Sequence, residues 1–277
     1  MYTINCKGKI VVIDKPLVMG IINATPDSFF EGHLNKTEAG ILALATQMIA
    51  DGADMLDIGG QSTRPGSKRI TTAEELERVL PVIKIIHQNF PETILSIDTY
   101  CSKVAAAAVA AGASIVNDIS AGSMDNQMLD TVAGLKVPYV CMHMQGTPDT
   151  MQKAPDYTDI TKELLDFFIA KIEQCKKAGI MDIIIDPGFG FGKTIEHNFS
   201  VLKKLQVLSM LNKPILAGLS RKSTVYKTLE TTAATALNGT TVLNTMALTN
   251  GAAILRVHDV KEAKEAVTLF TAYKKAP

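Results

Sequence analysis

The sequence has no tryptophan, and aromatic residues make up only 5% of its 277 residues. Surfaces that stack on sugars or nucleic-acid bases are built from aromatic rings, so this composition argues against them. Neither sign of charge is in excess, because 28 Lys and Arg balance 28 Asp and Glu. A nucleic-acid backbone or an anionic membrane attracts surplus positive charge. We therefore expect neither nucleic acid nor a membrane among the partners.

Long hydrophobic runs are also missing. Apolar stretches such as Val104–Ala113 are Ala-rich and shorter than the roughly 18 residues of a membrane-spanning helix. The first ten residues lack the basic-then-apolar order of a signal peptide. These absences predict a soluble, cytoplasmic protein.

Cysteine is scarce and scattered. Its four occurrences form no C-x-x-C pair, and no histidines are paired at zinc-ligand spacing. The thiols are Cys6, Cys101, Cys141 and Cys175. We expect reduced structural thiols without a metal or redox role.

No Gly/Ser-rich linker, low-complexity tract or long block of like charge divides the chain. The simplest interpretation is one domain over residues 1–277. A single α/β barrel typically needs about 250 residues, so the length fits.

Short runs rich in Val, Ile and Leu alternate with segments of helical period, which indicates βαβ units and a parallel sheet. A hairpin is expected first, over Ile4–Ile13 around a Lys-Gly-Lys turn. The expected strands are Leu17–Asn23, Met55–Gly59, Thr93–Asp98, Ser114–Asp118, Tyr139–His143, Ile183–Asp186, Ile215–Leu219 and Ala253–Val257. The expected helices are Thr37–Ala50, Thr72–Asn89, Ser102–Ala111, Asn126–Ala133, Thr158–Lys177, Glu196–Met210, Thr235–Thr249 and Lys261–Tyr273.

Eight such units predict an α/β fold, a single (β/α)8 TIM barrel with an N-terminal β-hairpin. A doubly wound open sheet stays open as an alternative, because a sequence cannot show that a sheet closes.

Polar side chains stand at the carboxyl end of every expected strand. They are Asn23, Asp57, Asp98, Asn117, His143, Asp186, Ser220, Arg256 and His258. Barrel active sites form at this face, where strand ends and loops converge. Any one of these residues could instead cap a turn, but burying so many polar groups costs a few kcal/mol each unless they are satisfied. We expect a polar ligand to satisfy them.

The chemistry of this set is specific. It offers no Cys–His pair and no Ser–His–Asp order, so covalent catalysis is not expected. Asp and Asn suit a flat heterocycle with several N–H groups, such as a nucleobase or pterin. Arg256, His258 and the turn 220–223, which contains Lys222, suit an anion. Alternatively, Arg221 or Arg256 pairs with a structural carboxylate.

Two polar, glycine-containing loops, residues 24–33 and 59–67, are long enough to close over the barrel mouth. Phe29 and Phe30 in the first would be useful if closure buries them on a flat ring. The run Asp186–Lys193 combines glycines with a lysine but lacks the spacing of a phosphate-binding P-loop. A nucleotide site is not predicted there.

Taken together, these segments resemble one family, the dihydropteroate synthases. The similarity spans nearly the whole chain, and the motifs are jointly specific in this order. They are T-P-D-S-F at 25–29, S-T-R-P-G at 62–66, D-P-G-F-G-F-G-K at 186–193, S-R-K at 220–222 and R-V-H-D at 256–259.

The resemblance implies condensation of 6-hydroxymethyl-7,8-dihydropterin diphosphate with p-aminobenzoate in folate synthesis, by a Mg²⁺-dependent homodimer that sulfonamides target. Implied catalytic residues are Asp98, Lys222, Arg256 and His258. Implied pterin contacts are Asp98, Asn117, Met142, Asp186, Gly218 and Lys222. Implied p-aminobenzoate contacts are Thr63, Arg64, Pro65, Phe189, Ser220 and Ser223. Implied diphosphate contacts are Asn23, Arg256 and His258, with Asn23 also on the metal, and Asp27, Phe29 and Glu31 act from the first loop.

The chain departs from the family pattern at three places. Residues 30–33 read Phe-Glu-Gly-His where Asp-Gly-Gly is usual, Gln61 replaces a usual Glu, and Ala236 stands where Arg is common. We expect effects on loop support and packing. Two other functions remain as alternatives: a methyltetrahydrofolate-type methyltransferase, which has no use for the diphosphate site, and a non-catalytic pterin carrier.

Overall fold

The computed structural model describes residues 1–24, 38–62, 69–151 and 155–277. These residues contain an eight-stranded parallel sheet in the order β8-β7-β6-β5-β4-β3-β10-β9. The strands are β3 Leu17–Asn23, β4 Met55–Gly59, β5 Ile94–Asp98, β6 Ile115–Asp118, β7 Tyr139–Met142, β8 Ile183–Asp186, β9 Leu216–Ala217 and β10 Ile254–Val257. The sheet ends meet where Ile185 bridges Ile215 and its N–H donates to the carbonyl of Pro214 at 3.0 Å. The predicted (β/α)8 barrel is therefore confirmed.

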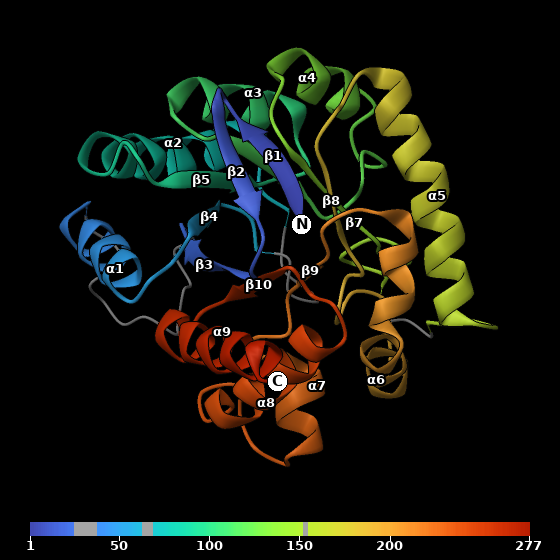
Figure 1. Cartoon of the computed structure of the whole chain (residues 1–277). Helices are drawn as coiled ribbons and strands as arrows, with labels where there is room; N and C mark the ends of the chain where they lie inside the picture. The colour runs from blue at the N-terminus through green and yellow to red at the C-terminus, as the bar shows by residue number, and fades with distance from the viewer. Residues whose placement is uncertain (25–37, 63–68, 152–154) are drawn as a thin grey trace.

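Helices surround the sheet in chain order (Figure 1). They are α1 Glu38–Ala50, α2 Thr72–Asn89, α3 Ser102–Ala111, α4 Met128–Leu135, α5 Ile160–Ala178, α6 Ile195–Lys203, α7 Ser223–Thr228, α8 Leu237–Thr249 and α9 Val260–Lys275. Local sequence fixes several ends: Thr71 and Glu74 form a capping box before α2, and Gly179 ends α5 in a left-handed conformation.

Two helical segments differ from the prediction. The helix expected over Glu196–Met210 stops at Lys203 and continues as a 3₁₀-helix, Leu205–Leu211. Leu205 and Leu208, both buried, lie three residues apart, which matches the three residues per turn of that helix. The short α7 was not expected, because six residues are too few for a helical period to be recognised in the sequence.

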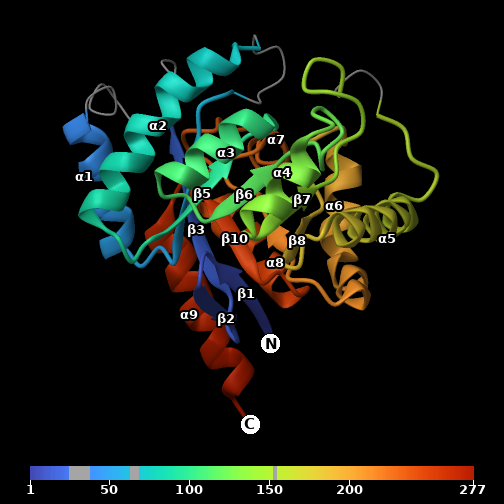
Figure 2. The same ribbon diagram turned by 90° about the horizontal axis from the view of Figure 1, so that it is seen from above.

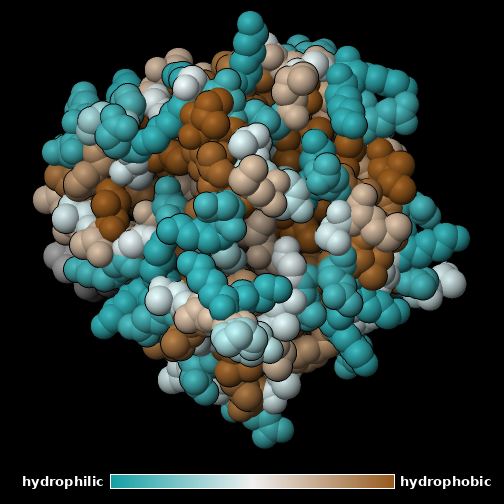
Figure 3. Space-filling model, viewed as in Figure 1, coloured by the Kyte–Doolittle hydropathy of each residue, from teal (hydrophilic) through white to brown (hydrophobic). Residues whose placement is uncertain are grey.

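The N-terminal hairpin, β1 Tyr2–Cys6 and β2 Lys9–Ile13, closes one end of the barrel. Lys7 and Gly8 at its turn both have positive φ, 52° and 92°, as a tight two-residue hairpin turn requires. The hairpin side chains Ile4, Cys6 and Ile13 pack on the first inward-facing residues of the barrel strands. Figure 2 shows the hairpin and both chain termini at the same end. On the face of the molecule seen in Figure 1, hydrophobic and hydrophilic side chains are mixed (Figure 3).

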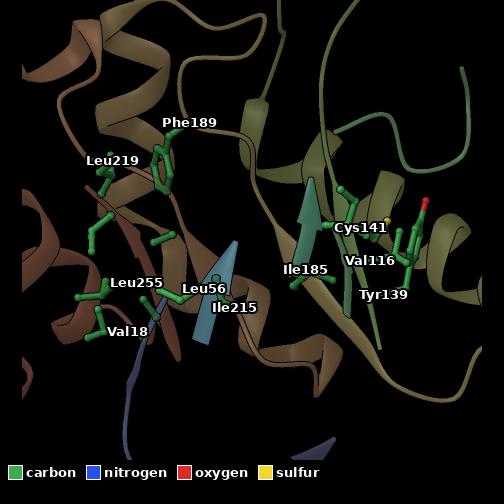
Figure 4. Close-up of a cluster of buried hydrophobic side chains, with 14 of the residues drawn as sticks. Val18, Leu56, Val116, Tyr139, Cys141, Ile185, Phe189, Ile215, Leu219 and Leu255 are labelled. Carbon is green, nitrogen blue, oxygen red and sulfur yellow. The ribbon is translucent and has the colours of Figure 1, made fainter. Parts of the chain in front are cut away.

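Alternation along the strands separates two layers of side chains. Outward-facing residues such as Val18, Leu56, Val116 and Leu255 pack under the helices in the main core (Figure 4). The bottom inward layer, against the hairpin, consists of Met19, Met55, Ile94, Ile115, Val140, Ile184, Leu216 and Ile254. Two residues further along the strands, the next inward positions are Ile21, Asp57, Ser96, Asn117, Met142, Asp186, Gly218 and Arg256. The interior of the barrel thus changes from apolar to largely polar side chains between two successive inward-facing positions of the strands.

Candidate active site at the carboxyl ends of the strands

Asp57 is the centre of this polar layer. Its carboxylate is fully buried, and its Oδ2 accepts hydrogen bonds from Asn117 Nδ2 at 2.9 Å and Arg256 Nε at 2.6 Å. Its Oδ1 is buried and has no hydrogen-bond partner among the described residues. The two donors therefore take their orientation from one fixed oxygen.

Arg256 bridges two carboxylates, because its second nitrogen donates to Asp98 Oδ2 at 2.6 Å. Burial opposes the guanidinium charge, but Asp57 and Asp98 outweigh it and raise the pKa of Arg256 above its ordinary value. Burial raises the pKa of Asp98 to about 7, and Arg256 offsets this only in part. The alternative in which Arg256 pairs with carboxylates is thus observed.

Asp186 ends β8 and is 5% exposed. Its Oδ1 accepts the N–H of Gly188 at 2.7 Å, and burial raises the pKa of the carboxyl. Gly188 has φ of +69°, and a Cβ there would lie 1.9 Å from the carbonyl oxygen of His143. No larger residue fits this turn unless the backbone shifts.

Lys222 follows β9 and extends toward Asp186, whose charge acts on its amine. Its Nζ donates to the carbonyl of Phe189 at 2.5 Å and lies 4.7 Å from the centre of the Phe191 ring. Gly218 lies beside this amine, since a Cβ there would be in ordinary van der Waals contact with Nζ at 3.6 Å. Burial lowers the pKa of Lys222 to about 8, although the Asp186 charge acts in the opposite direction.

The neighbouring Arg221 has a structural role. Its guanidinium forms a two-pronged pair with Asp259 at 2.7 and 2.8 Å and donates to the carbonyls of Ala233 and Ala234. The alternative predicted for this arginine, a structural ion pair, is therefore confirmed. Its backbone, with φ of 52°, turns the chain so that Lys222 follows into the pocket.

The remaining strand ends bring further polar groups to this face. Ser220 Oγ lies 2.9 Å from His258 Nδ1 and accepts the backbone N–H of His258 at 3.2 Å. Asn23 is half-buried at the end of β3, and Ser223 begins α7. Ser220 and His258 therefore fix each other's side-chain orientation at the ends of neighbouring strands.

Two expectations need correction. Phe189 has no exposed surface and lies in the main core near Leu219, so its ring does not line the mouth of the barrel (Figure 4). The half-exposed Phe191 contacts Lys222 instead. His143 is also not a ligand group at the mouth: it follows an inward-facing residue and therefore points outward, where its ring packs edge-on against Phe167 at 4.8 Å.

The sequence argument did not single out Lys193, although the structure buries it next to His143. The only signal was its place after three closely spaced glycines. The predicted residues Asp27, Phe29, Glu31, Thr63, Arg64 and Pro65 lie outside the described residues.

Among the described ranges, no three His, Cys, Asp or Glu side chains are grouped so that they could hold a metal ion. No helix in the same ranges is both long and apolar enough to span a membrane. The four cysteines are unpaired, and all but Cys101 are buried.

A barrel with this polar interior matches the family model for pterin binding enzymes over residues 19–258. Fold and site together define a pterin-binding barrel. The dihydropteroate synthase of Escherichia coli (strain K12) is 41% identical over 268 residues, covering 96% of this chain and 94% of the relative. The Streptococcus pyogenes dihydropteroate synthase is also 41% identical, over 95% of this chain and 98% of its own length. The chain belongs to the dihydropteroate synthase family.

Solved structures agree with this assignment. The Yersinia pestis dihydropteroate synthase, determined with a sulfonamide drug, superposes with a TM-score of 0.95 at 38% identity and covers 99% of this chain and 100% of its own. The Xanthomonas albilineans dihydropteroate synthase in complex with 7,8-dihydropteroate gives a TM-score of 0.88 at 38% identity over 100% of both chains.

Proposed function

We propose that the protein condenses 6-hydroxymethyl-7,8-dihydropterin diphosphate with p-aminobenzoate to give 7,8-dihydropteroate and diphosphate in folate synthesis. One observation carries the proposal: Asn117 and Asp186 share an inward-facing layer with Arg256, with Asp98 and Lys222 beside it. Relatives with 38% to 41% identity are synthases, and Xanthomonas albilineans structures hold 4-aminobenzoic acid and 7,8-dihydropteroate.

The pterin is assigned to the polar layer. Carboxylates accept paired N–H groups and the Asn117 amide offers both a donor and an acceptor, so Asp186, Asn117 and Asp98 suit the edge of a pterin. Met142 and Gly218 lie in the same inward layer, where an apolar side chain and an absent one leave a flat slot. Lys222 would donate to the pterin carbonyl side.

The diphosphate is assigned to Arg256, His258 and Asn23. As the bond between the pterin methylene carbon and the diphosphate oxygen breaks, negative charge leaves with the diphosphate and positive charge develops on the pterin. Arg256 and His258 stabilise the first, and the Asp98 carboxylate stabilises the second. The neutral amine of p-aminobenzoate then attacks the methylene carbon and loses a proton.

The p-aminobenzoate site lies nearer the mouth. Lys222, Ser220 and Ser223 are the described residues assigned to it, and the sequence prediction also assigns Thr63, Arg64 and Pro65. A cation beside two hydroxyls suits the carboxylate of this substrate. Sulfonamides, which resemble p-aminobenzoate, would compete there.

Magnesium is proposed as the metal. The described residues offer no cluster of acidic or histidine side chains for a resident ion, whereas the Asn23 amide oxygen supplies one hard ligand. Mg²⁺ keeps several waters and often takes its remaining ligands from substrate phosphates, so the donor set fits an ion that arrives with the diphosphate. When bound, it neutralises charge on the leaving group.

A homodimer in the cytoplasm is also proposed. Val242 and Met246 lie four residues apart on one face of α8 and are 45% and 47% exposed. Such a pair on an outer helix suits contact with a second copy. Unpaired thiols suit a reducing compartment.

The experiment is direct. Purified protein is incubated with both substrates and Mg²⁺, and dihydropteroate and diphosphate are followed by chromatography. We expect equal amounts of the two products, no reaction with EDTA, and losses of about 100-fold or more in Lys222→Ala and Arg256→Ala. Lys227→Ala, an exposed lysine on α7, is the matched control.

Pterin binding without any product would contradict the proposal and favour a non-catalytic carrier. Methyl transfer from methyltetrahydrofolate by the same preparation would favour a methyltransferase.

A further inference from the structure

Lys193 lies in the loop between β8 and α6 and is only 3% exposed. Its Nζ is 3.0 Å from His143 Nδ1 and donates to the carbonyls of Gly188 and Phe191, each at 3.1 Å. A buried amine is costly unless it is satisfied, and here it has partners on several sides. The amine therefore joins the end of β7 to two points of the loop after β8.

Other groups hold this loop as well: the Gly190 N–H donates to Asn198 Oδ1 and the Tyr157 hydroxyl donates to the carbonyl of Gly192, each at 2.7 Å. Gly188, Gly190 and Gly192 all have positive φ, 69°, 81° and 59°. A Cβ on Gly192 would lie 2.6 Å from the carbonyl oxygen of Gln145, so the backbone packs where side chains would otherwise be. Glycines are the most flexible residues before folding, and the lysine supplies the fixed centre around which this run is wrapped.

The same loop forms contacts with both key side chains of the site. Gly188 donates its N–H to Asp186 Oδ1 at 2.7 Å, and its carbonyl accepts from Lys193. The carbonyl of Phe189 accepts from Lys222 at 2.5 Å, and the Phe191 ring lies 4.7 Å from the same Nζ. Each group that touches Asp186 or Lys222 is thus in, or next to, a residue held by Lys193.

We propose that Lys193 is a positioning residue for the substrate pocket, which sets the orientations of Asp186 and Lys222 through the loop 187–192 without touching substrate. His143 supports this arrangement as an acceptor. Burial lowers the pKa of His143 to about 3, so its ring stays neutral, and the tautomer with the proton on Nε2 leaves Nδ1 as the acceptor for the amine 3.0 Å away. The inference rests on the proposed function, since the pocket it orients is the pterin site.

The test uses Lys193→Met, which keeps an unbranched side chain one atom shorter and removes its donors, with Lys203→Met on α6 as the exposed control. Affinity for the pterin diphosphate is measured by calorimetric titration, and kcat and KM are measured separately. We expect affinity about tenfold weaker and a raised pterin KM in Lys193→Met, with the control unchanged. A lower melting temperature with normal affinity and KM would show a purely structural role and overturn the proposal.

A double-mutant cycle identifies the path of the effect. In an Asp186→Asn background, Lys193→Met should weaken pterin binding by less than about threefold, because the side chain it orients has already been altered. A full tenfold loss in that background would contradict action through Asp186. If Lys193→Met does not fold, His143→Phe removes the ring nitrogens, including the Nδ1 acceptor, but keeps an aromatic ring, and it should weaken pterin binding in the same direction. Unchanged binding would overturn the proposal.

Hydrogen exchange separates this inference from the proposed function. Amides of residues 188–192 should exchange faster in Lys193→Met than in Lys203→Met, whether or not the wild-type protein forms dihydropteroate. Equal exchange in both variants would overturn the role of Lys193, and absence of product with faster exchange would overturn only the proposed function.

Discussion

Arg256 and Lys222 are neighbouring cations whose surroundings act on their protonation in opposite directions. Asp57 and Asp98 raise the pKa of Arg256, so it stays charged at any pH the protein tolerates. Burial lowers the pKa of Lys222 to about 8, and the charges of Asp186 and Asp98 offset this only in part. Of these two cations, only Lys222 titrates near neutral pH.

A bell-shaped pH dependence of kcat/KM follows. Asp98 must lose its proton to stabilise positive charge, so activity should fall as the pH drops below about 7. Lys222 must keep its proton to bind its acceptors, so activity should also fall as the pH rises above about 8. Rates from about pH 5 to 10 test this, since kcat/KM reports the free enzyme. Lys222→Arg should lose the alkaline limb, and a flat wild-type profile would contradict the assignment.

The sequence predicted which residues the strands present to the pocket, because a period of two fixes the direction of every side chain once a strand is recognised. Asp57, Asn117 and Asp186 are examples. The period says nothing about loops, so it could not show that Phe191 and not Phe189 would face Lys222. Burial of Lys193 depends on the path of three glycines, which no pattern encodes.

At the level of elements, bounds were predicted well where an apolar run meets a sharp local signal. The strand Ile183–Asp186 ends before a proline and α2 starts at a capping box, and both have the predicted bounds. The segment after Lys203 keeps a spacing of buried leucines that also fits a helix, so its change to 3₁₀ geometry was not visible. Closure was invisible as well, because it rests on a bridge between residues far apart in the chain.

The hairpin should stabilise the barrel without affecting catalysis. Ile4 is 2% exposed against the bottom layer, and Ile4→Ala should lower the free energy of unfolding by about 2–4 kcal/mol through the cavity it leaves. Ile10 on the same hairpin is 60% exposed, so Ile10→Ala should change it by no more than about 0.5 kcal/mol. Urea unfolding measures both, with kcat expected to stay constant. Equal effects of the two substitutions would show that the hairpin does not seal the core.

For the whole molecule, the outer face of α8 predicts self-association. Light scattering after gel filtration should give twice the 29.8 kDa mass of the chain. Replacing both Val242 and Met246 by Glu should give the monomer, because like charges cannot be buried unpaired in an interface. Ile169→Glu on α5, where the side chain is 55% exposed, is the control and should stay dimeric. A monomeric wild-type protein would refute the proposal.

Because the hairpin closes one end of the barrel, the interior can be reached only from the other end. Ile4, Cys6 and Ile13 fill its base, so a molecule held at the level of Asn117 and Asp186 has no exit through the base. Substrates and products must therefore enter and leave through the same end, at the carboxyl ends of the strands. A ligand bound in the inner part of the barrel must therefore enter before, and leave after, a ligand bound at the carboxyl ends of the strands. A compound bound at the outer position blocks the release of the inner ligand as well as the entry of the next one.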